Sequence, residues 1–210
     1  LSGNRFGDAG STVVIEEFME GEEASLLAFV DGKTVVPMIA SQDHKRIFDG
    51  DKGPNTGGMG TYAPAPVLTD ALRDEAMKTI LEPMVAAMQK EGMPYVGCLY
   101  AGLMITPQGP KVVEFNARFG DPETQVVLPL LDSDLGQIMM ACATGTLTAD
   151  MVKWKDSSAA CVILASKGYP ETSSKGDVIH GDIKQHDTTI VFHSGTKLVG
   201  DEYVTNGGRV

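Results

Sequence analysis

The stretch VVEFNARFGDPET, residues 112–124, turns from an apolar strand pattern into a dense run of polar side chains. Side chains two positions apart in a strand lie on the same face, so Glu114 and Asn116 are predicted to point the same way. A carboxylate and an amide oxygen at a strand end are oxygen ligands of the kind that magnesium prefers. Arg118 adds a planar fork for phosphate or carboxylate. An E-x-N pattern alone is a weak predictor of a metal site, and a polar strand end in solvent is the alternative.

Outward from this stretch, the patterns predict a mixed chain of short strands and helices. The expected strands are 13–18, 24–31, 34–40, 95–106, 111–114, 159–165, 176–180, 189–193 and 203–210. Apolar residues every three or four positions predict a long helix that begins at Thr69 or Asp70, is kinked or split at Pro83, and ends at Gly92. Two shorter helices are expected near 122–131 and 133–144, the second capped by Ser133.

Residues 41–63 lose all periodicity and are rich in glycine, which predicts a long functional or disordered loop. Residues 145–156 have no strong pattern either, so a domain boundary is placed there, giving domains 1–150 and 151–210.

Composition excludes several classes of partner. A net charge of −11 argues against non-specific binding of nucleic acid. No apolar run approaches the length of about 20 residues that spans a bilayer, so no membrane partner is expected. Cys98, Cys142 and Cys161 are far apart, set among apolar neighbours and without C-x-x-C spacing, which favours unpaired thiols in a reducing cytoplasm. The oligomeric state is left open.

Other motifs accompany the first stretch in a fixed order along the chain. They are VVIEEFMEGEEAS (13–25), SQDHKR (41–46), GPNTGGMG (53–60), GDVIHG (176–181), FHSGTKL (192–198) and TNGGRV (205–210). Together with EFNARFGDPET they resemble the glycinamide ribonucleotide synthetase family, the phosphoribosylamine–glycine ligases of the ATP-grasp superfamily. The resemblance implies an α+β fold, with an antiparallel sheet and flanking helices as the larger ATP-grasp lobe, followed by part of a β-rich C-terminal domain.

The resemblance also implies a nucleotide site at the hinge, residues 13–23. The Glu17 carbonyl would accept from the adenine amino group, the Met19 N–H would donate to the ring, and Glu23 would accept from the ribose hydroxyls. The cofactor-binding set is Glu16, Glu17, Phe18, Met19, Glu23 and Asn116. From the pattern alone, acidic residues at an ordinary strand end are the alternative.

For the substrates, the glycines of PNTGGMG can turn several N–H groups toward one anion. The expected substrate-binding residues are Arg46, Pro54, Asn55, Thr56, Gly57, Gly58, Asp121, Pro122 and Glu123. Asp121 and Glu123 would orient the glycine ammonium, although both could instead cap the helix that follows. Lys45 and Arg118 would share the charge of the transferred phosphoryl group as catalytic residues, and a solvated basic loop is the alternative for Lys45 and Arg46.

Magnesium, or manganese, is expected on Glu114 and Asn116. ATP-grasp enzymes commonly add an acid from the neighbouring strand, but residues 97–104 contain none. One metal would then rely on waters and phosphates, or only one metal would be held well.

The implied reaction belongs to purine biosynthesis and joins glycine to 5-phosphoribosylamine through a glycyl phosphate, with ATP giving ADP and phosphate. The family's N-terminal substrate domain and small lobe are not found before residue 13, so the chain is interpreted as an incomplete catalytic unit. The alternatives are a nucleotide-binding fragment without catalysis and a related ATP-grasp ligase or carboxylase.

Overall fold

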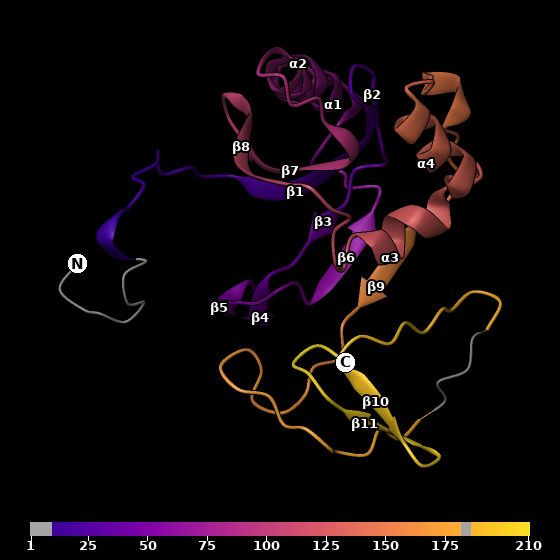
Figure 1. Ribbon diagram of the computed structural model, residues 1–210. Coiled ribbons are helices and arrows are strands. Elements are labelled where there is room, and N and C mark those ends of the chain that lie inside the picture. Colours follow the sequence, from indigo (N-terminus) through magenta and orange to yellow (C-terminus); the bar gives the residue numbers. More distant parts are fainter. Residues whose placement is uncertain (1–9, 182–185) are drawn as a thin grey trace.

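The computed structural model describes residues 10–181 and 186–210, and its centre is a four-stranded antiparallel sheet (Figure 1). In spatial order its strands are β2 (Val35–Pro37), β1 (Glu22–Asp31), β7 (Val96–Thr106) and β8 (Gly109–Asn116). Every residue of β1 from Ala24 to Asp31 is buried, because helices cover both faces of the sheet. The expected hairpin after Asp31 forms, and the Asp31 carboxylate accepts from the Thr34 N–H at 2.7 Å. The predicted α+β class is confirmed.

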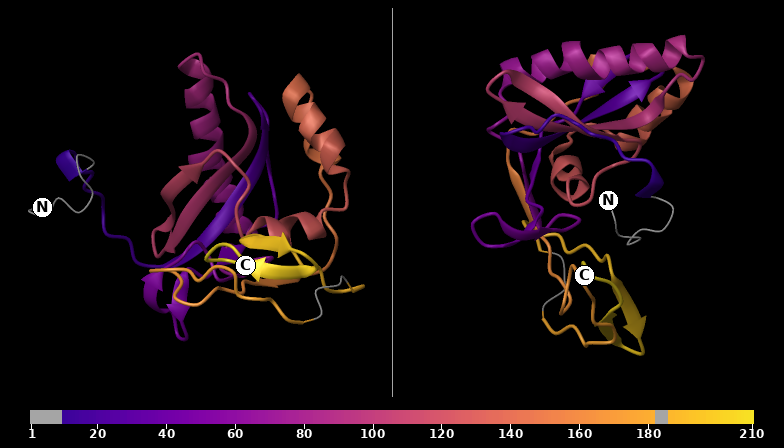
Figure 2. Two further views of the ribbon diagram at one scale, coloured as in Figure 1. Left: turned by 60° about the horizontal axis from the view of Figure 1, so that its bottom comes forward. Right: turned by 90° about the vertical axis from the view of Figure 1, so that its left-hand side faces the viewer.

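One long helical segment packs along one face of the sheet (Figure 2). It consists of α1 (Asp70–Ala76), a π-helical turn η2 (Met77–Leu81) and α2 (Glu82–Lys90). Thr69 caps α1 as expected, since its side chain accepts from the Leu72 N–H. The break predicted at Pro83 is the π turn that ends just before it, and the helix ends at Gly92, whose φ is +76°.

Shorter helices cover the other face, where Leu27, Phe29 and Tyr100 belong to a second apolar cluster. These helices are α3 (Thr124–Val127), η3 (Leu128–Leu130), α4 (Leu135–Thr144) and η4 (Ala149–Met151). The helix expected over 122–131 is therefore shorter and partly 3-10. The predicted Ser133 cap is wrong: Asp134 caps α4 by accepting from Gln137 N–H at 3.0 Å, while the Ser133 hydroxyl accepts from the Lys153 N–H.

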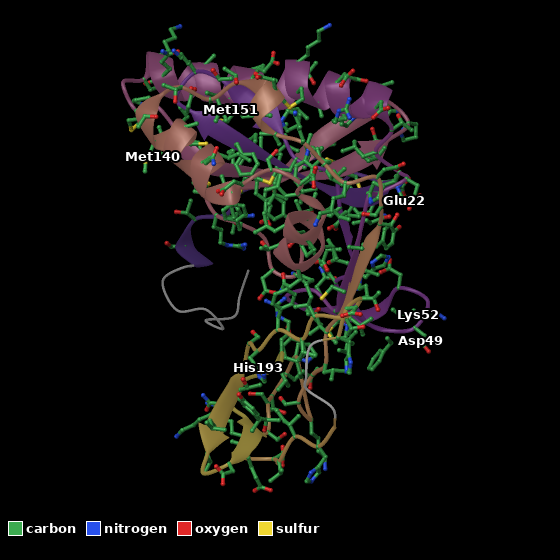
Figure 3. The ribbon with its side chains drawn as sticks, turned by 90° about the vertical axis from the view of Figure 1, so that its right-hand side faces the viewer. Glu22, Asp49, Lys52, Met140, Met151 and His193 are labelled. Carbon is green, nitrogen blue, oxygen red and sulfur yellow. The ribbon has the colours of Figure 1, made fainter. Side chains whose placement is uncertain are left out.

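The glycine-rich stretch 41–63 is not the structureless loop that was expected. It forms β3 (Gln42–Asp43), β4 (Arg46–Phe48), β5 (Lys52–Asn55) and β6 (Gly60–Ala63). The β4–β5 hairpin turns at Gly50 and Asp51, both with positive φ, and Figure 3 shows Asp49 and Lys52 together at its tip. Sequence periodicity misses these strands because each is only two to four residues long.

Residues after the expected 150/151 boundary extend a sheet that begins before it. Strand β9 (Ala159–Val162) pairs with β6, which in turn pairs with β3. Beyond it, β10 (Thr196–Val199) and β11 (Glu202–Thr205) form a hairpin in a separate body below the main sheet (Figure 1).

Three strand predictions are wrong. Residues 13–18 form no strand and are exposed, since no described neighbouring strand pairs with them. Residues 176–180 contribute a single bridge, Val178 to Val204, and the stretch 189–193 contributes only the bridge from Thr189. Each stretch contains consecutive β-branched or other apolar residues, but strands also need a partner edge. Within the described residues, no helix is long and apolar enough to cross a membrane.

Candidate functional site

The end of β8 places the predicted metal ligands side by side. Glu114 and Asn116 share a face, and the Asn116 Nδ2 donates to Glu114 Oε1 at 3.0 Å. This bond uses the amide nitrogen, so the amide oxygen and the second carboxylate oxygen remain for a cation. A pair of hard oxygen donors that leaves other positions to water and phosphate suits magnesium. Among the residues that the structure describes, no group of three or more His, Cys, Asp or Glu could form a complete protein cage.

A cavity of about 240 Å³ opens beside this strand end. Its lining residues are Asp43, Lys45, Asn55, Thr56, Gly57, Tyr100, Glu114, Arg118, Asp121 and Glu123. The structure thus brings together most of the predicted site from four separate stretches of sequence. The predicted metal- and substrate-binding residues outside the lining are Asn116, Arg46, Pro54, Gly58 and Pro122. Arg46 donates to the Gly53 carbonyl on the β4–β5 hairpin, while Gly58 and Pro122 pack against each other.

Lys45 lies between β3 and β4 and reaches the start of β1 in the central sheet. Its Nζ lies 2.8 Å from Glu23 Oε2, so the carboxylate expected to hold a ribose is paired with the lysine expected to hold phosphate. Burial alone would lower the pKa of Lys45, but the Glu23 bond and charge, with Asp43 and Glu114 nearby, raise it above its ordinary value. Lys45 is therefore a fixed positive charge at this wall.

Glu123 is the most deeply buried acid of the cavity, with 3% of its surface exposed. Its Oε1 accepts from the Tyr100 hydroxyl at 2.5 Å and from the Ser25 hydroxyl at 3.0 Å. Burial and the Glu123 charge raise the pKa of Tyr100, which keeps its hydroxyl protonated as a donor. Two donors on one oxygen are what a buried carboxylate needs to stay in place.

Asp43 lies on β3 close to that buried acid. Its Oδ1 accepts from the Thr61 hydroxyl at 3.2 Å. Burial, together with the charge of Glu123, raises the pKa of Asp43 to about 6. The lining of the cavity has four acidic residues, Asp43, Glu114, Asp121 and Glu123, and two basic residues, Lys45 and Arg118. Such a balance favours a cationic or amine-bearing ligand beside any anion.

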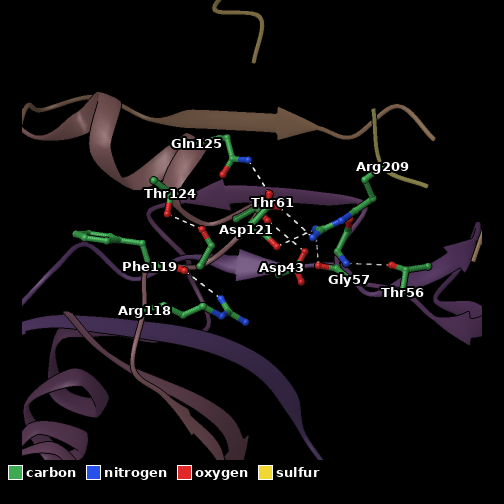
Figure 4. Close-up of polar contacts among 12 residues, drawn as sticks. Asp43, Thr56, Gly57, Thr61, Arg118, Phe119, Asp121, Thr124, Gln125 and Arg209 are labelled. Atoms are coloured by element: carbon green, nitrogen blue, oxygen red, sulfur yellow. Dashed lines mark hydrogen bonds and ion pairs between the residues drawn. The ribbon is translucent and has the colours of Figure 1, made fainter. Parts of the chain in front are cut away.

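Asp121 and Glu123 do not cap the helix that follows them. Glu123 occupies the N-cap position of α3, but its side chain makes no capping bond. Asp121 Oδ1 accepts from Gln125 Nε2 at 2.7 Å, and its Oδ2 lies 3.0 Å from the Arg209 guanidinium (Figure 4). The capping alternative is therefore wrong, and both carboxylates belong to the cavity wall. Arg118 is exposed nearby and donates to the Phe119 carbonyl at 3.0 Å.

The glycine turn does not form the predicted anion nest. Each successive N–H group already donates inside the protein: Thr56 to the Lys45 carbonyl, Gly57 to the Tyr169 hydroxyl, Gly58 to the Thr56 hydroxyl and Met59 to the His44 carbonyl. An anion at this turn would have to displace those acceptors. The turn instead forms a closed wall of the cavity.

A larger hollow of about 840 Å³ lies at the start of β1, beside the β7–β8 turn. It is lined by residues 17–22, 105–108, Val67 and Lys111. Three of the predicted hinge residues, Glu17, Phe18 and Met19, line it, and Glu17 Oε1 is 2.5 Å from Lys111 Nζ. Glu16 is exposed just before it, and Glu23 follows directly on Glu22 of the lining.

Sequence reasoning missed five residues around the cavity: Ser25, Asp43, Tyr100, Tyr169 and Arg209. Asp43 could have been found, since it alternates with Lys45 in the stretch SQDHKR. Tyr100 also carried a signal, because a tyrosine in an otherwise apolar strand needs a partner for its hydroxyl. The other three become visible only once distant segments meet.

Two family profiles match the chain. Residues 1–124 match the ATP-grasp (A) domain of phosphoribosylglycinamide synthetase, and residues 159–210 match its C domain. The chain is 57% identical over 213 residues to a phosphoribosylamine–glycine ligase of Caulobacter vibrioides, covering 100% of the chain and 50% of that relative. It is 55% identical to the trifunctional purine biosynthetic protein adenosine-3 of Gallus gallus, over 98% of the chain and 21% of that relative.

Comparison with solved structures points to the same family and fold. A crystal structure of phosphoribosylamine–glycine ligase from Thermotoga maritima is 34% identical, with a TM-score of 0.78, over 93% of this chain and 48% of that one. A biotin carboxylase domain of a thermophilic 2-oxoglutarate carboxylase, at 13% identity and a TM-score of 0.59, shares the fold. The ATP-grasp fold is confirmed, and the chain spans about half the length of the curated ligases that it matches.

Proposed function

This chain belongs to the phosphoribosylglycinamide synthetase family, and from that premise we propose that it carries the central part of an ATP-dependent ligase of purine biosynthesis. The ligase joins glycine to 5-phosphoribosylamine and gives glycinamide ribonucleotide, ADP and phosphate. One observation carries the proposal: the Glu114 carboxylate, which is bonded to Asn116, lines the same cavity as two phosphate-type cations and an acidic wall.

Nucleotide binding is assigned to the larger hollow at the hinge. Its size suits a ligand of the nucleoside class, since small-molecule pockets measure roughly 300–1,000 Å³. The backbone of Glu17 and Met19 would recognise the adenine ring, with Glu16 and Phe18 beside them. For Glu23 to hold the ribose hydroxyls, its bond to Lys45 must open, which would also free Lys45 for a phosphate.

Glu114 and Asn116 would hold magnesium, or manganese, at the end of β8. When bound, the ion supplies charge neutralisation for the phosphate oxygens. The protein's own contribution would be two positive charges, since Lys45 and Arg118 both line the cavity. Two cations aimed at one phosphoryl group stabilise charge without reorganising during the reaction.

The acidic wall would bind the amines. Asp121 and Glu123 are proposed to orient the glycine ammonium, and Asn55, Thr56 and Gly57 to face the ribosyl substrate. Arg46, Pro54, Gly58 and Pro122 would then act only through the shape of the turn. Transfer of a phosphoryl group to the glycine carboxylate gives an acyl phosphate, and attack by the ribosylamine forms the amide bond while phosphate leaves. The buried setting of Glu123 helps to exclude water, which would otherwise destroy the acyl phosphate.

We further propose the division into domains at 150/151 and a cytoplasmic location for the ligase, the latter supported by three cysteines that form no disulfide. These two assignments do not affect the site.

Phosphate release tests the function. The longer protein that contains this sequence is assayed with ATP, magnesium, glycine and 5-phosphoribosylamine, and then with each component omitted. Release that requires all four supports the ligase, and release that needs bicarbonate instead of glycine indicates a carboxylase. The 210-residue chain is assayed beside it, with negligible turnover expected because it spans only about half of its relatives. Glycine-independent phosphate release by the longer protein would overturn the proposal.

A further inference from the structure

The last residues of the chain reach back to the cavity through one side chain. Arg209 Nη1 donates to the Gly57 carbonyl at 2.6 Å and to the Asp121 carbonyl at 2.8 Å, and its Nη2 pairs with Asp121 Oδ2 at 3.0 Å (Figure 4). These acceptors lie 152 and 88 residues away along the sequence. A planar fork that donates to several acceptors at once fixes their relative positions, which lysine cannot do.

Tyr169 supplies a second tie from the same region. Its hydroxyl accepts from the Gly57 N–H at 2.9 Å, so both the N–H and the carbonyl of Gly57 are held by C-terminal side chains. The Tyr169 ring also lies against Gly208, where an added Cβ would meet the ring at 2.2 Å. Tyr169 and Arg209 therefore form one packed unit around Gly57.

The segment that carries Arg209 is itself anchored. The Ser166 N–H donates to the Gly208 carbonyl at 2.9 Å, and the Val210 N–H donates to the Leu164 carbonyl at 2.8 Å. Arg209 thus projects from a short paired stretch rather than from a free end. An added Cβ at Gly57 would lie 2.9 Å from the guanidinium carbon, so a larger residue there would push the arginine side chain out of its present position.

Direct binding of an anion by Arg209 is a poor fit to this geometry. Both terminal nitrogens already donate to the protein, the side chain is 21% exposed, and Arg209 is absent from the cavity lining. Gly57 and Asp121, which it holds, are both in the lining.

We propose that Arg209 and Tyr169 are positioning residues that hold the Gly57 turn and Asp121 together as one wall of the cavity. The C-terminal region is then a structural part of the site. The contacts that hold this wall are present in the 210-residue chain whatever its function. Only the effect of the wall on substrate binding rests on the proposed function.

Amide hydrogen exchange followed by NMR in the 210-residue chain tests the position. Tyr169→Phe removes one acceptor and leaves the ring, so the Gly57 amide is expected to exchange about fivefold faster, as the loss of one neutral hydrogen bond allows. Arg209→Lys keeps the positive charge but loses the planar fork of donors. It should therefore change the amide exchange of Gly57 and of Asp121 together. Tyr203→Phe and Arg73→Lys are the matched controls, and amides of β1 and β7 report on the fold.

Exchange at Gly57 that is unchanged in both variants would overturn the proposal, whatever the activity of the longer protein. In that longer protein, Arg209→Lys and Tyr169→Phe should raise the KM for the ribosylamine more than they lower kcat. Asp121→Asn should raise this KM less than Arg209→Lys does. A fall in kcat at constant KM would instead assign Arg209 to the reacting phosphate and contradict a positioning role.

Discussion

Leu26, Leu27 and Leu103 of the central sheet are completely buried, whereas Leu164, Leu198 and Val199 of the C-terminal region keep 72%, 56% and 53% of their surface exposed. From residue 163 onward, the described part of the chain buries only Ser166, Val204 and Thr205.

The sheet is therefore stabilised by apolar burial on both faces, while the C-terminal region depends on backbone bonds and on its ties to the cavity wall. A region with so little core cannot hold a site rigid by itself. In this protein it is the polar ties through Arg209 and Tyr169 that connect it to the better packed lobe.

The largest expected effect contrasts two leucines. Leu103→Ala removes a fully buried side chain from β7 and should lower the free energy of unfolding by about 2–5 kcal/mol. Leu198→Ala in β10 removes a half-exposed one and should change it by less than about 0.5 kcal/mol. Urea denaturation of both variants measures the difference. Equal losses would mean that the C-terminal region has a core of its own.

The second effect concerns Asp43, the partly buried acid of β3. Because the folded-state pKa of Asp43 is raised from 3.8 to about 6, its contribution to stability is fully present below about pH 3.8 and is lost as pH rises through 6. Asp43→Asn should flatten stability between pH 4 and 6 and raise it near pH 7 by about 1–3 kcal/mol. Denaturation at several pH values measures this, with exposed Asp49→Asn as control. A steeper pH dependence in Asp43→Asn would show that the pKa is lowered instead.

A smaller effect is expected for the hydroxyl that holds Glu123. Tyr100→Phe removes the donor at 2.5 Å and leaves only Ser25 on that oxygen. The loss should be about 1–2 kcal/mol, because a buried carboxylate then lacks one partner. Thermal unfolding with Tyr203→Phe as the matched control measures it. No difference between the two variants would show that water replaces the hydroxyl.

The smallest effect is expected at the exposed hinge. Lys111→Met removes the ion pair with Glu17, whose side chains are 32% and 66% exposed. Such surface pairs contribute about 0–1 kcal/mol. Unfolding at low and high salt should therefore differ little between the variant and the parent. A loss comparable to that of Leu103→Ala would mean that residues 13–20 pack more firmly than their exposure indicates.

Much of the lobe could be predicted from the sequence because its elements are long and periodic. The β7–β8 pair, the helix from Thr69 and its break before Pro83 follow from local patterns alone. So does the shared face of Glu114 and Asn116, since alternation fixes it within one strand.

Predictions failed where a feature depends on distant partners. Residues 13–18 were expected to form a strand, but no described neighbouring edge pairs with them. Strands β3 and β6 are recognisable only through their pairing with each other and with the distant β9. The Gly57 N–H, expected in an anion nest, donates to the Tyr169 hydroxyl instead, and no local pattern encodes that contact. The same is true of Arg209, which lies in a quoted motif but acquires its role through residues 57 and 121.

The ligase reaction is proposed to take place in the cavity at the end of β8, so Glu114→Gln in the longer protein should impair it. Glycine-dependent phosphate release should fall by at least about tenfold. Even the loss of a residue that only hydrogen-bonds to a metal ligand weakens metal affinity or activity by about 10- to 100-fold. Glu91→Gln, an exposed acid at the end of α2, should release phosphate at the parental rate. Undiminished phosphate release in Glu114→Gln, measured with magnesium below saturation, would show that the reaction does not depend on the end of β8.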